Sequence, residues 1–171
     1  GFGGFLMDAE LFDDLQFGIS HAEAVLMDPQ QRLVQQLSGQ ALTALSHDAV
    51  NTNVWSDMGV FVGISTTDYG KVASRHNASV SAYAATGGAL SVAAGRLSYF
   101  YGAAGPCMSV DTACSSSLVG THLACMAYAL GHATSNLSSG VNLTLDPTTT
   151  ATFHIAGMLA QDGRCKTLDT S

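Results

Sequence analysis

Near its middle the chain reads Gly105-Pro-Cys-Met-Ser-Val-Asp-Thr-Ala-Cys-Ser-Ser-Ser-Leu118. The short apolar run from Cys107 to Val110 is typical of a buried strand, and the polar residues that follow end it. Apolar residues then recur at helical spacing from Leu118 to Leu130, and Gly131 ends the helix. The pattern predicts that Cys114 lies where a strand turns into a helix.

A cysteine at such a junction has the surroundings of a nucleophile. The positive end of the helix dipole stabilises a thiolate there. The backbone N–H groups of the first helical turn have no acceptor within the helix, so they can bind a developing oxyanion. These features indicate acyl transfer through a covalent thioester on Cys114.

Five blocks of the sequence resemble signatures of one enzyme family, the β-ketoacyl synthases. The active-site motif of ketosynthase domains in type I polyketide synthases and animal-type fatty acid synthases is similar to Asp111-Thr-Ala-Cys-Ser-Ser-Ser-Leu118. The other blocks follow the family's order between about Gly4 and Asp169, and they are Met27-Asp-Pro-Gln-Gln-Arg-Leu33, Ala94-Gly-Arg-Leu-Ser-Tyr99, Gly140-Val-Asn142 and Asp162-Gly-Arg-Cys-Lys166. The chain is therefore identified as a member of that family.

The resemblance implies a function, a fold and partners. Cys114 is expected to be the nucleophile, and its backbone N–H is expected to be one donor of the oxyanion hole. The cysteine would take an acyl group from an acyl carrier protein, and a malonyl-type extender would condense with it after losing carbon dioxide. The substrates would be carried on the phosphopantetheine of the carrier, with no cofactor bound by the chain. The implied fold is the α/β, thiolase-like fold of αβαβα layers, and the implied assembly is a homodimer.

The resemblance also implies that some catalytic groups lie outside these 171 residues. Ketosynthases use two histidines well downstream of the cysteine, and neither of the blocks that carry them is present. Residues 1–171 are therefore expected to be the N-terminal half of a ketosynthase domain, truncated at both ends and inactive in condensation when isolated. An intracellular, cytoplasmic location is expected.

Three alternatives remain open for the same residues. The ketosynthase of a type I fatty acid synthase differs from the polyketide type in its pathway. A cysteine thioesterase would also use Cys114, but it needs a histidine and a carboxylate within hydrogen-bonding reach. A non-catalytic ketosynthase-like partner typically lacks the cysteine, so Cys114 weighs against it.

The composition excludes several classes of function. Hydrophobic residues make up 47% of the chain and charged residues only 11%, which favours elements that further protein buries. The formal net charge of −7 argues against nucleic-acid binding, and no apolar run reaches the roughly 18 residues of a membrane span. No histidine has metal-ligand spacing to another histidine or to a cysteine. Cys107, Cys125 and Cys165 are expected to be buried, reduced thiols.

A capped helix is predicted from Asp28 to about Leu45. Asp28 can cap it, and the following proline suits the first helical position. Gln31 is expected to return a hydrogen bond to the N–H of the capping residue.

The remaining patterns complete an α/β order without a domain boundary. The continuous apolar run from Val60 to Ile64 predicts a central strand. A glycine-rich helix is predicted from Ser81 to Gly95, and a strand from Leu137 to Leu145. The threonine-rich stretch that contains His154 is expected to be strand-like.

Overall fold

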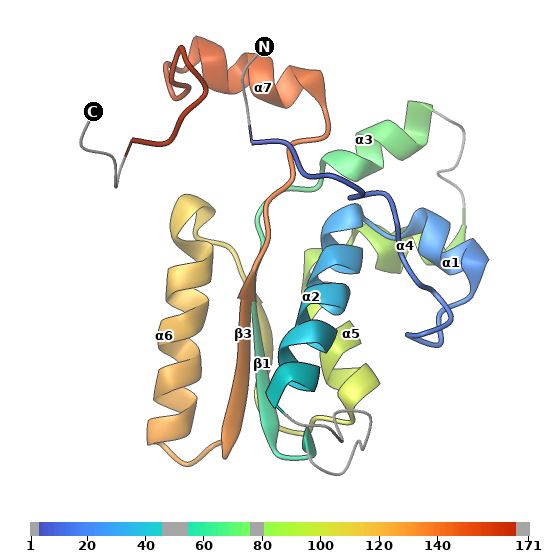
Figure 1. Cartoon of the computed structure of the whole chain (residues 1–171), viewed down its shortest axis with the longest axis vertical. Helices are drawn as coiled ribbons and strands as arrows, with labels where there is room; N and C mark the ends of the chain where they lie inside the picture. The colour runs from blue at the N-terminus through green and yellow to red at the C-terminus, as the bar shows by residue number, and fades with distance from the viewer. Residues whose placement is uncertain (1–3, 46–54, 76–80, 167–171) are drawn as a thin grey trace.

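A parallel three-stranded sheet forms the centre of the molecule (Figure 1). The computed structural model describes residues 4–45, 55–75 and 81–166. The strands are β1 (Met58–Gly63), β2 (Cys107–Val110) and β3 (Ser135–Gly140), in the order β2-β1-β3 across the sheet. Because all three run in the same direction, their last residues meet at one edge, the carboxyl edge of the sheet.

Helices cover both faces of this sheet (Figure 1). α2 (Pro29–Leu45) and α5 (Leu90–Tyr101) lie on one face, and α6 (Ser116–Ala129) lies on the other. A short 3₁₀ turn, η2 (Ala113–Ser115), joins β2 to α6. The result is a helix–sheet–helix sandwich.

The shorter helices lie around this sandwich. α1 (His21–Leu26), α3 (Asp68–Arg75) and α4 (Ala82–Gly88) lie on the same side of the sheet as α2 and α5 (Figure 1). α7 (Pro147–Ile155) lies beyond the carboxyl edge of the sheet. It therefore stands over the place where the strands end.

β1 is the central strand, as the apolar run predicts. All of its residues are buried, and so is Ile64 just after it. Val60 and Val62 belong to the core beneath α2 and α5, whereas Phe61 packs with Ala124 of α6. Alternate side chains of one strand thus build the cores on both faces of the sheet.

β2 forms where the sequence predicts it, but the prediction that it is buried is wrong. Cys107 and Met108 are exposed, because β2 is an edge strand that pairs with β1 alone among the described strands. The expectation of buried thiols is also wrong, since Cys107, Cys125 and Cys165 are all exposed. Cys125 lies on the exposed face of α6.

The start of α2 confirms the predicted cap but not the predicted role of Gln31. Oδ1 of Asp28 accepts a hydrogen bond from the N–H of Gln30 at 2.9 Å. The N–H of Asp28 itself donates to the carbonyl oxygen of Gly87 in α4. Gln31 donates its side-chain amide to carbonyl oxygens at the junction of α4 and α5 instead. Tertiary contacts with α4 have replaced the local capping bond.

Two predicted element boundaries differ from the structure. The helix predicted from Ser81 to Gly95 is two helices, α4 and α5, which are separated at Ala89. The strand predicted from Leu137 to Leu145 begins earlier and ends at Gly140. The chain leaves the sheet there and enters the loop that leads to α7.

The threonine-rich stretch around His154 is helix α7, so the strand-like prediction is wrong. Asp146 caps this helix by accepting the N–H of Thr148, and Pro147 occupies its first position. Gly157 adopts a φ of 69° after the helix and turns the chain back.

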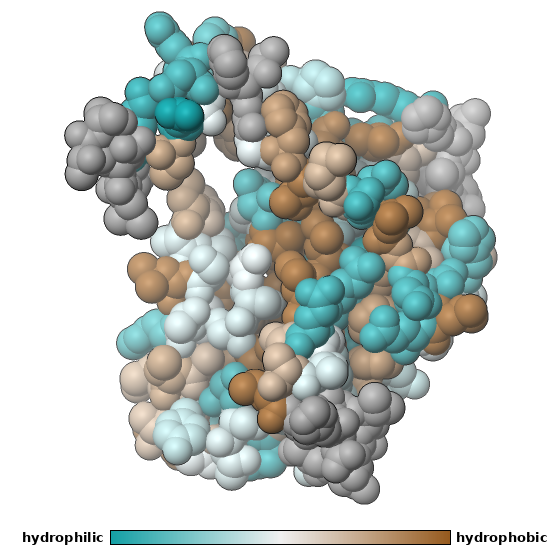
Figure 2. Space-filling model, viewed as in Figure 1, coloured by the Kyte–Doolittle hydropathy of each residue, from teal (hydrophilic) through white to brown (hydrophobic). Residues whose placement is uncertain are grey.

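The surface carries many large apolar side chains (Figure 2). Leu118 and Tyr128 of α6 are 73% and 65% exposed, and Ile155 of α7 is 86% exposed. Figure 2 also shows an opening between α7 and the first turn of α6. Across the residues that the structure describes, no helix combines the length and the hydropathy needed to span a bilayer.

Candidate active site

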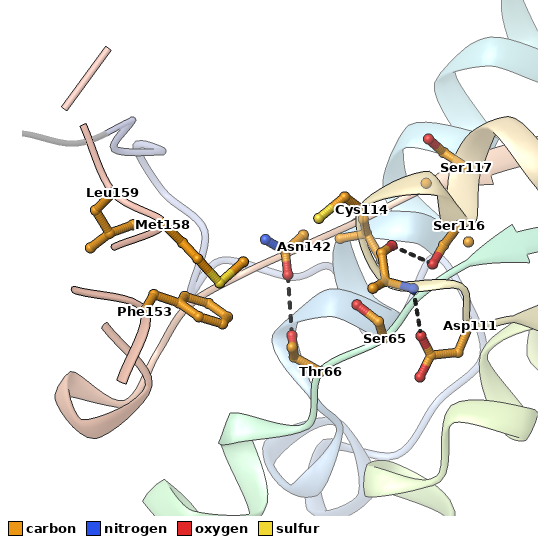
Figure 3. Close-up of a pocket in the computed structure, with 14 residues that line it drawn as sticks. Ser65, Thr66, Asp111, Cys114, Ser116, Ser117, Asn142, Phe153, Met158 and Leu159 are labelled. Atoms are coloured by element: carbon orange, nitrogen blue, oxygen red, sulfur yellow. Dashed lines mark hydrogen bonds between the residues drawn. The ribbon is translucent and has the colours of Figure 1, made fainter. Parts of the chain in front are cut away.

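Cys114 lies in η2, at the junction of β2 and α6 that the sequence predicts. Its side chain is exposed and lines a cavity of about 690 Å³ at the carboxyl edge of the sheet (Figure 3). Gly63 at the end of β1 and Gly140 at the end of β3 line the same cavity. The thiol is therefore open to a cavity at the end of the sheet, where a substrate can reach it.

Two side chains hold the turn that carries Cys114. Oδ1 of Asp111 accepts the N–H of Ala113 at 3.0 Å. The hydroxyl oxygen of Ser116, which is buried, accepts the N–H of Thr112 at 2.9 Å. The same hydroxyl donates to the carbonyl oxygen of Ala113 at 2.6 Å. Hydrogen bonds from before and after the cysteine thus fix the backbone on which it sits.

Ala113, directly before the cysteine, adopts a left-handed conformation with φ of 55°. This conformation costs an alanine about 1–2 kcal/mol relative to its preferred regions. Strained residues of this kind gather at functional sites, where the surrounding structure holds them in place. The bonds that Asp111 and Ser116 make to Ala113 offset the strain. The sequence carries no signal for it, because alanine does not favour this region.

Two glycines form a seat for the first turn of α6. Gly63 and Gly140 are partners in the register of β1 and β3. A Cβ atom added to Gly63 would lie 2.5 Å from the backbone nitrogen of Ser117, and one added to Gly140 would collide with the Ser117 side chain. Gly140 is therefore a point of close approach between β3 and α6. Because β1 and β3 both end in glycine, no side chain separates them from α6, and the helix can pack directly on their backbone.

The opposite wall of the cavity is apolar and comes from α7 and the turn after it. Phe153, Met158 and Leu159 face Cys114 across the cavity in Figure 3. Asn142 lies between the two walls and accepts a hydrogen bond from the hydroxyl of Thr66 at 3.2 Å. The cavity thus combines a thiol, a polar floor and an apolar wall. Such a lining suits a small molecule that is apolar except at a carbonyl group next to the thiol.

The ionisable groups of the cavity are few. Among the described residues that line it, Cys114 and Asp111 are the ionisable ones, and no histidine is present. Cys107 has an exposed surface, yet neighbouring atoms partly desolvate its thiol and raise its pKa, an effect that a hydrogen bond with Ser98 opposes. The described parts of the chain hold no group of three His, Cys, Asp or Glu side chains that is suited to a metal.

A family model for the N-terminal domain of β-ketoacyl synthases matches residues 1–171. The chain belongs to the β-ketoacyl synthase family. Its fold is the thiolase-like fold of the ketosynthases, and the parallel sheet between helices agrees with the α/β class expected from the sequence.

Relatives of this ketosynthase segment are large polyketide synthases. Polyketide synthase GfsA of Streptomyces halstedii is 47% identical over 164 residues, which are 96% of this chain and 2% of that protein. Erythronolide synthase EryA2 of Saccharopolyspora erythraea is 43% identical over 166 residues, which are 96% of this chain and 5% of that protein. The chain therefore spans only a small part of the relatives that it matches.

Solved ketosynthases share the fold of the segment. The ketosynthase from module 6 of the bacillaene synthase from Bacillus subtilis 168 superposes with a TM-score of 0.81 at 38% identity. That match covers 95% of this chain and 27% of the solved one. The oxazolomycin ketosynthase domain of Streptomyces albus JA3453 gives a TM-score of 0.81 at 34% identity, over 96% of this chain and 28% of that one.

Three of the five family blocks do not contribute side chains to the cavity. Met27 to Leu33 form the start of α2, Ala94 to Tyr99 lie in α5, and Asp162 to Lys166 follow a turn after α7. The block Gly140 to Asn142 lies beside Cys114, because it ends β3 at the cavity. The apolar wall from α7 was missed, since the threonines around it favoured a strand.

Proposed function

We propose that this chain supplies the nucleophile of a ketosynthase in a modular polyketide synthase. The observation that carries the proposal is that Cys114 lines a cavity at the carboxyl edge of the sheet. It lies on a turn that Asp111 and buried Ser116 hold in place against the strain at Ala113. Membership of the family and the likeness to polyketide synthases support this function.

The first step is transfer of an acyl group. The Cys114 thiolate attacks the carbonyl carbon of a thioester on an acyl carrier protein. The backbone N–H of Cys114, at the start of the helix, stabilises the oxyanion that forms. The bond from carbon to the phosphopantetheine sulfur then breaks, the carrier thiol takes up a proton, and the acyl group stays on Cys114.

The second step forms the carbon–carbon bond. A malonyl-type thioester on a carrier loses carbon dioxide, and the resulting carbanion attacks the acyl carbon on Cys114. The bond from that carbon to the cysteine sulfur breaks and returns the thiolate. The product is a β-ketoacyl chain on the carrier, two backbone carbons longer.

Residues outside the chain complete this second step. The family resemblance assigns decarboxylation to two histidines, and the described lining of the cavity holds none. The chain corresponds to 27% of the bacillaene ketosynthase, so most of such a domain lies outside it. Residues 1–171 alone are therefore proposed to lack condensation activity.

Two competing functions receive less support. A fatty acid synthase would use the same site, but the similar proteins compared above carry the names of polyketide synthases. A thioesterase needs a histidine beside Cys114. The one carboxylate in the described lining, that of Asp111, is already bound to the N–H of Ala113.

The proposal includes a homodimer formed through β2. Carbonyl groups of Pro106 and Val110 accept hydrogen bonds from β1, so the alternate N–H of Cys107 points away from β1, to the edge where no described strand pairs. An open strand edge can pair with the same strand of a second copy. Cys107→Pro should lower the mass measured by light scattering to that of a monomer, whereas Cys107→Ser should leave the dimer intact. A dimer that persists in Cys107→Pro would contradict this assembly.

Mass spectrometry tests the function directly. The full-length synthase is incubated with an acyl thioester of its carrier protein, digested, and searched for acylated cysteines. The acyl group should be on Cys114, and Cys114→Ala should abolish loading while Cys125→Ser retains it. Acylation at Cys107 or Cys125 would contradict the proposal. Release of free acid without a β-ketoacyl product would favour the thioesterase.

A further inference from the structure

α7 carries the apolar wall of the cavity, but apolar packing does not hold it there. None of its residues is buried. Ile155 at its end is 86% exposed, and Phe153 is only half-buried. The position of the wall must therefore come from the contacts at the start of the helix.

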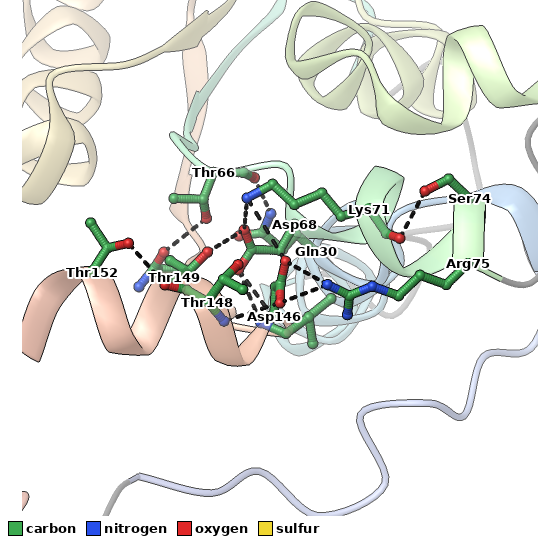
Figure 4. Close-up of polar contacts among 12 residues, drawn as sticks. Gln30, Thr66, Asp68, Lys71, Ser74, Arg75, Asp146, Thr148, Thr149 and Thr152 are labelled. Carbon is green, nitrogen blue, oxygen red and sulfur yellow. Dashed lines mark hydrogen bonds and ion pairs between the residues drawn. The ribbon is translucent and has the colours of Figure 1, made fainter.

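Those contacts centre on Asp68, the first residue of α3 (Figure 4). Its carboxylate is buried and accepts the backbone N–H groups of Leu145 and Asp146, at 3.3 and 3.2 Å. Its other oxygen accepts the hydroxyl of Thr149 at 2.8 Å. One side chain thus binds the loop before α7 and the first turn of α7 together.

Asp146 and two cations close the cluster. The Asp146 carboxylate caps α7 and lies 3.3 Å from Nη2 of Arg75. Nζ of Lys71 lies 3.7 Å from Asp68 and 3.9 Å from Asp146. Two carboxylates therefore face two cations, and the charges balance where the carboxylates are buried.

The same region is tied to the floor of the cavity. The buried side chain of Gln30 donates to the carbonyl oxygen of Thr66 and accepts the N–H of Leu143 at 3.0 Å. Thr66 in turn donates to Asn142. Hydrogen bonds of Gln30 and Thr66 thus join the loop after β1 to the loop after β3. The start of α7 is held by a different set of contacts, those of Asp68 and its partners in the cluster.

We propose that Asp68 and Thr149 are positioning residues that set which acyl chains the cavity accepts. The proposal rests on the proposed acyl transfer to Cys114. Asp68 fixes the direction in which α7 leaves the sheet, and that direction sets the distance from Cys114 to the wall formed by Phe153, Met158 and Leu159. Neither Asp68 nor Thr149 lines the cavity. They act through the wall and not on the substrate.

Thr149→Val tests this with a matched control on the same helix. Thr149 donates its hydroxyl to Asp68, whereas Thr152 donates its hydroxyl to the carbonyl of Thr148 within α7. Thr152→Val thus makes the same chemical change without touching the cluster. Thr149→Ser keeps the hydroxyl and should restore the wild-type behaviour.

The measurement compares two probes on Cys114 in the full-length synthase. Loading by acetyl- and octanoyl-pantetheine is followed by mass spectrometry, and alkylation by iodoacetamide reports the thiol itself. In Thr149→Val the ratio of octanoyl to acetyl loading should change roughly tenfold, because small displacements of a binding wall have large effects. The rate of alkylation should stay unchanged. Asp68→Asn should shift the ratio in the same direction.

The possible results distinguish a failure of the positioning role from a failure of the proposed acyl transfer to Cys114. An unchanged ratio in both Thr149→Val and Asp68→Asn, with normal loading, would overturn the positioning role and leave the acyl transfer standing. An equal change in Thr152→Val would overturn it as well. Absence of loading by either thioester in the wild-type synthase would overturn the acyl transfer and this inference together.

Discussion

Ser116 and Ala113 are joined by a hydrogen bond across Cys114. The hydroxyl of Ser116 donates to the carbonyl oxygen of Ala113 at 2.6 Å, and the two residues enclose Cys114 between them. Ala113 has a left-handed backbone, which an alanine does not adopt unaided. Ser116 therefore helps to orient the side chain of Cys114, although it lies two residues after the cysteine in the sequence.

Replacement of Ser116 by alanine should disturb the turn more than replacement of its neighbour Ser115. The N–H of Thr112 and the carbonyl of Ala113 lose their shared partner in Ser116→Ala, and the loss of each bond costs about 0.5–1.5 kcal/mol. Ser115 is exposed, and among the described residues its hydroxyl bonds with Thr112. We expect Ser116→Ala to lower the melting temperature and slow the alkylation of Cys114. Equal effects of the two substitutions would contradict this role.

Alanine at either glycine of the α6 seat should displace the helix. Gly63→Ala places a methyl group 2.5 Å from the backbone of Ser117, and Gly140→Ala meets the side chain of Ser117. Backbone cannot move aside cheaply, so both variants should unfold at lower urea concentration. Gly120→Ala is the matched control, because its nearest atom would lie 3.9 Å away and alanine favours a helix. The control should be as stable as the wild type or more so.

Loss of the Gln30 side chain should loosen the floor of the cavity. Gln30→Leu keeps the size of the residue but leaves the Thr66 carbonyl and the Leu143 N–H without their partner. The loss of each hydrogen bond to these partly buried groups costs about 0.5–1.5 kcal/mol. Gln40→Leu on the exposed face of α2 should have little effect. Urea unfolding measures both variants, and equal midpoints would show that Gln30 has no such role.

Two capping aspartates should respond to pH in opposite ways. Burial raises the pKa of Asp28 above its ordinary 3.8, against opposing hydrogen bonds from Gln30. The N–H and hydroxyl of Thr148, aided by Arg75, lower the pKa of Asp146 below 3.8. At neutral pH ionised Asp28 therefore weakens folding, whereas ionised Asp146 strengthens it.

Replacement of each aspartate by asparagine shows whether its charge stabilises or destabilises the fold. At pH 7 Asp28→Asn should be more stable than the wild type, because asparagine still caps α2 without carrying a buried charge. Asp146→Asn should be less stable at the same pH. As the pH falls, the stability gained in Asp28→Asn should disappear between the raised pKa of Asp28 and pH 3.8. The stability lost in Asp146→Asn should disappear only below pH 3.8, as Asp146 itself becomes protonated. Urea unfolding between pH 7 and pH 3 measures both, and differences of the same sign would contradict the assignment.

Local patterns were sufficient to predict the junction at Cys114. The apolar strand, the polar turn and the periodic helix are adjacent in sequence, and each carries its own signal. The central position of β1 followed in the same way from an apolar run with no polar face. The family blocks agreed with these patterns and extended them to the whole chain.

Features set by distant residues could not be predicted. The place of α7 depends on Asp68, which is 78 positions from the N–H of Asp146 that it binds. Gln31 has a local partner available, yet it bonds with a carbonyl 55 positions away. The left-handed Ala113 is held by neighbours that do not change its own preference. Such contacts have no periodicity and no fixed spacing.

The paired glycines at the ends of β1 and β3 support the turn that carries Cys114, whereas α7 and the turn after it supply the apolar wall of the cavity. Helix α6 rests on bare backbone at Gly63 and Gly140, so the support of the turn that carries Cys114 comes from the sheet and not from the wall on the far side of the cavity. Under the proposed function, residues at the end of α7 could be exchanged to admit a bulkier acyl group without moving the turn that carries Cys114. The support of Cys114 and the wall that faces it thus belong to different elements, so one can change in evolution without the other.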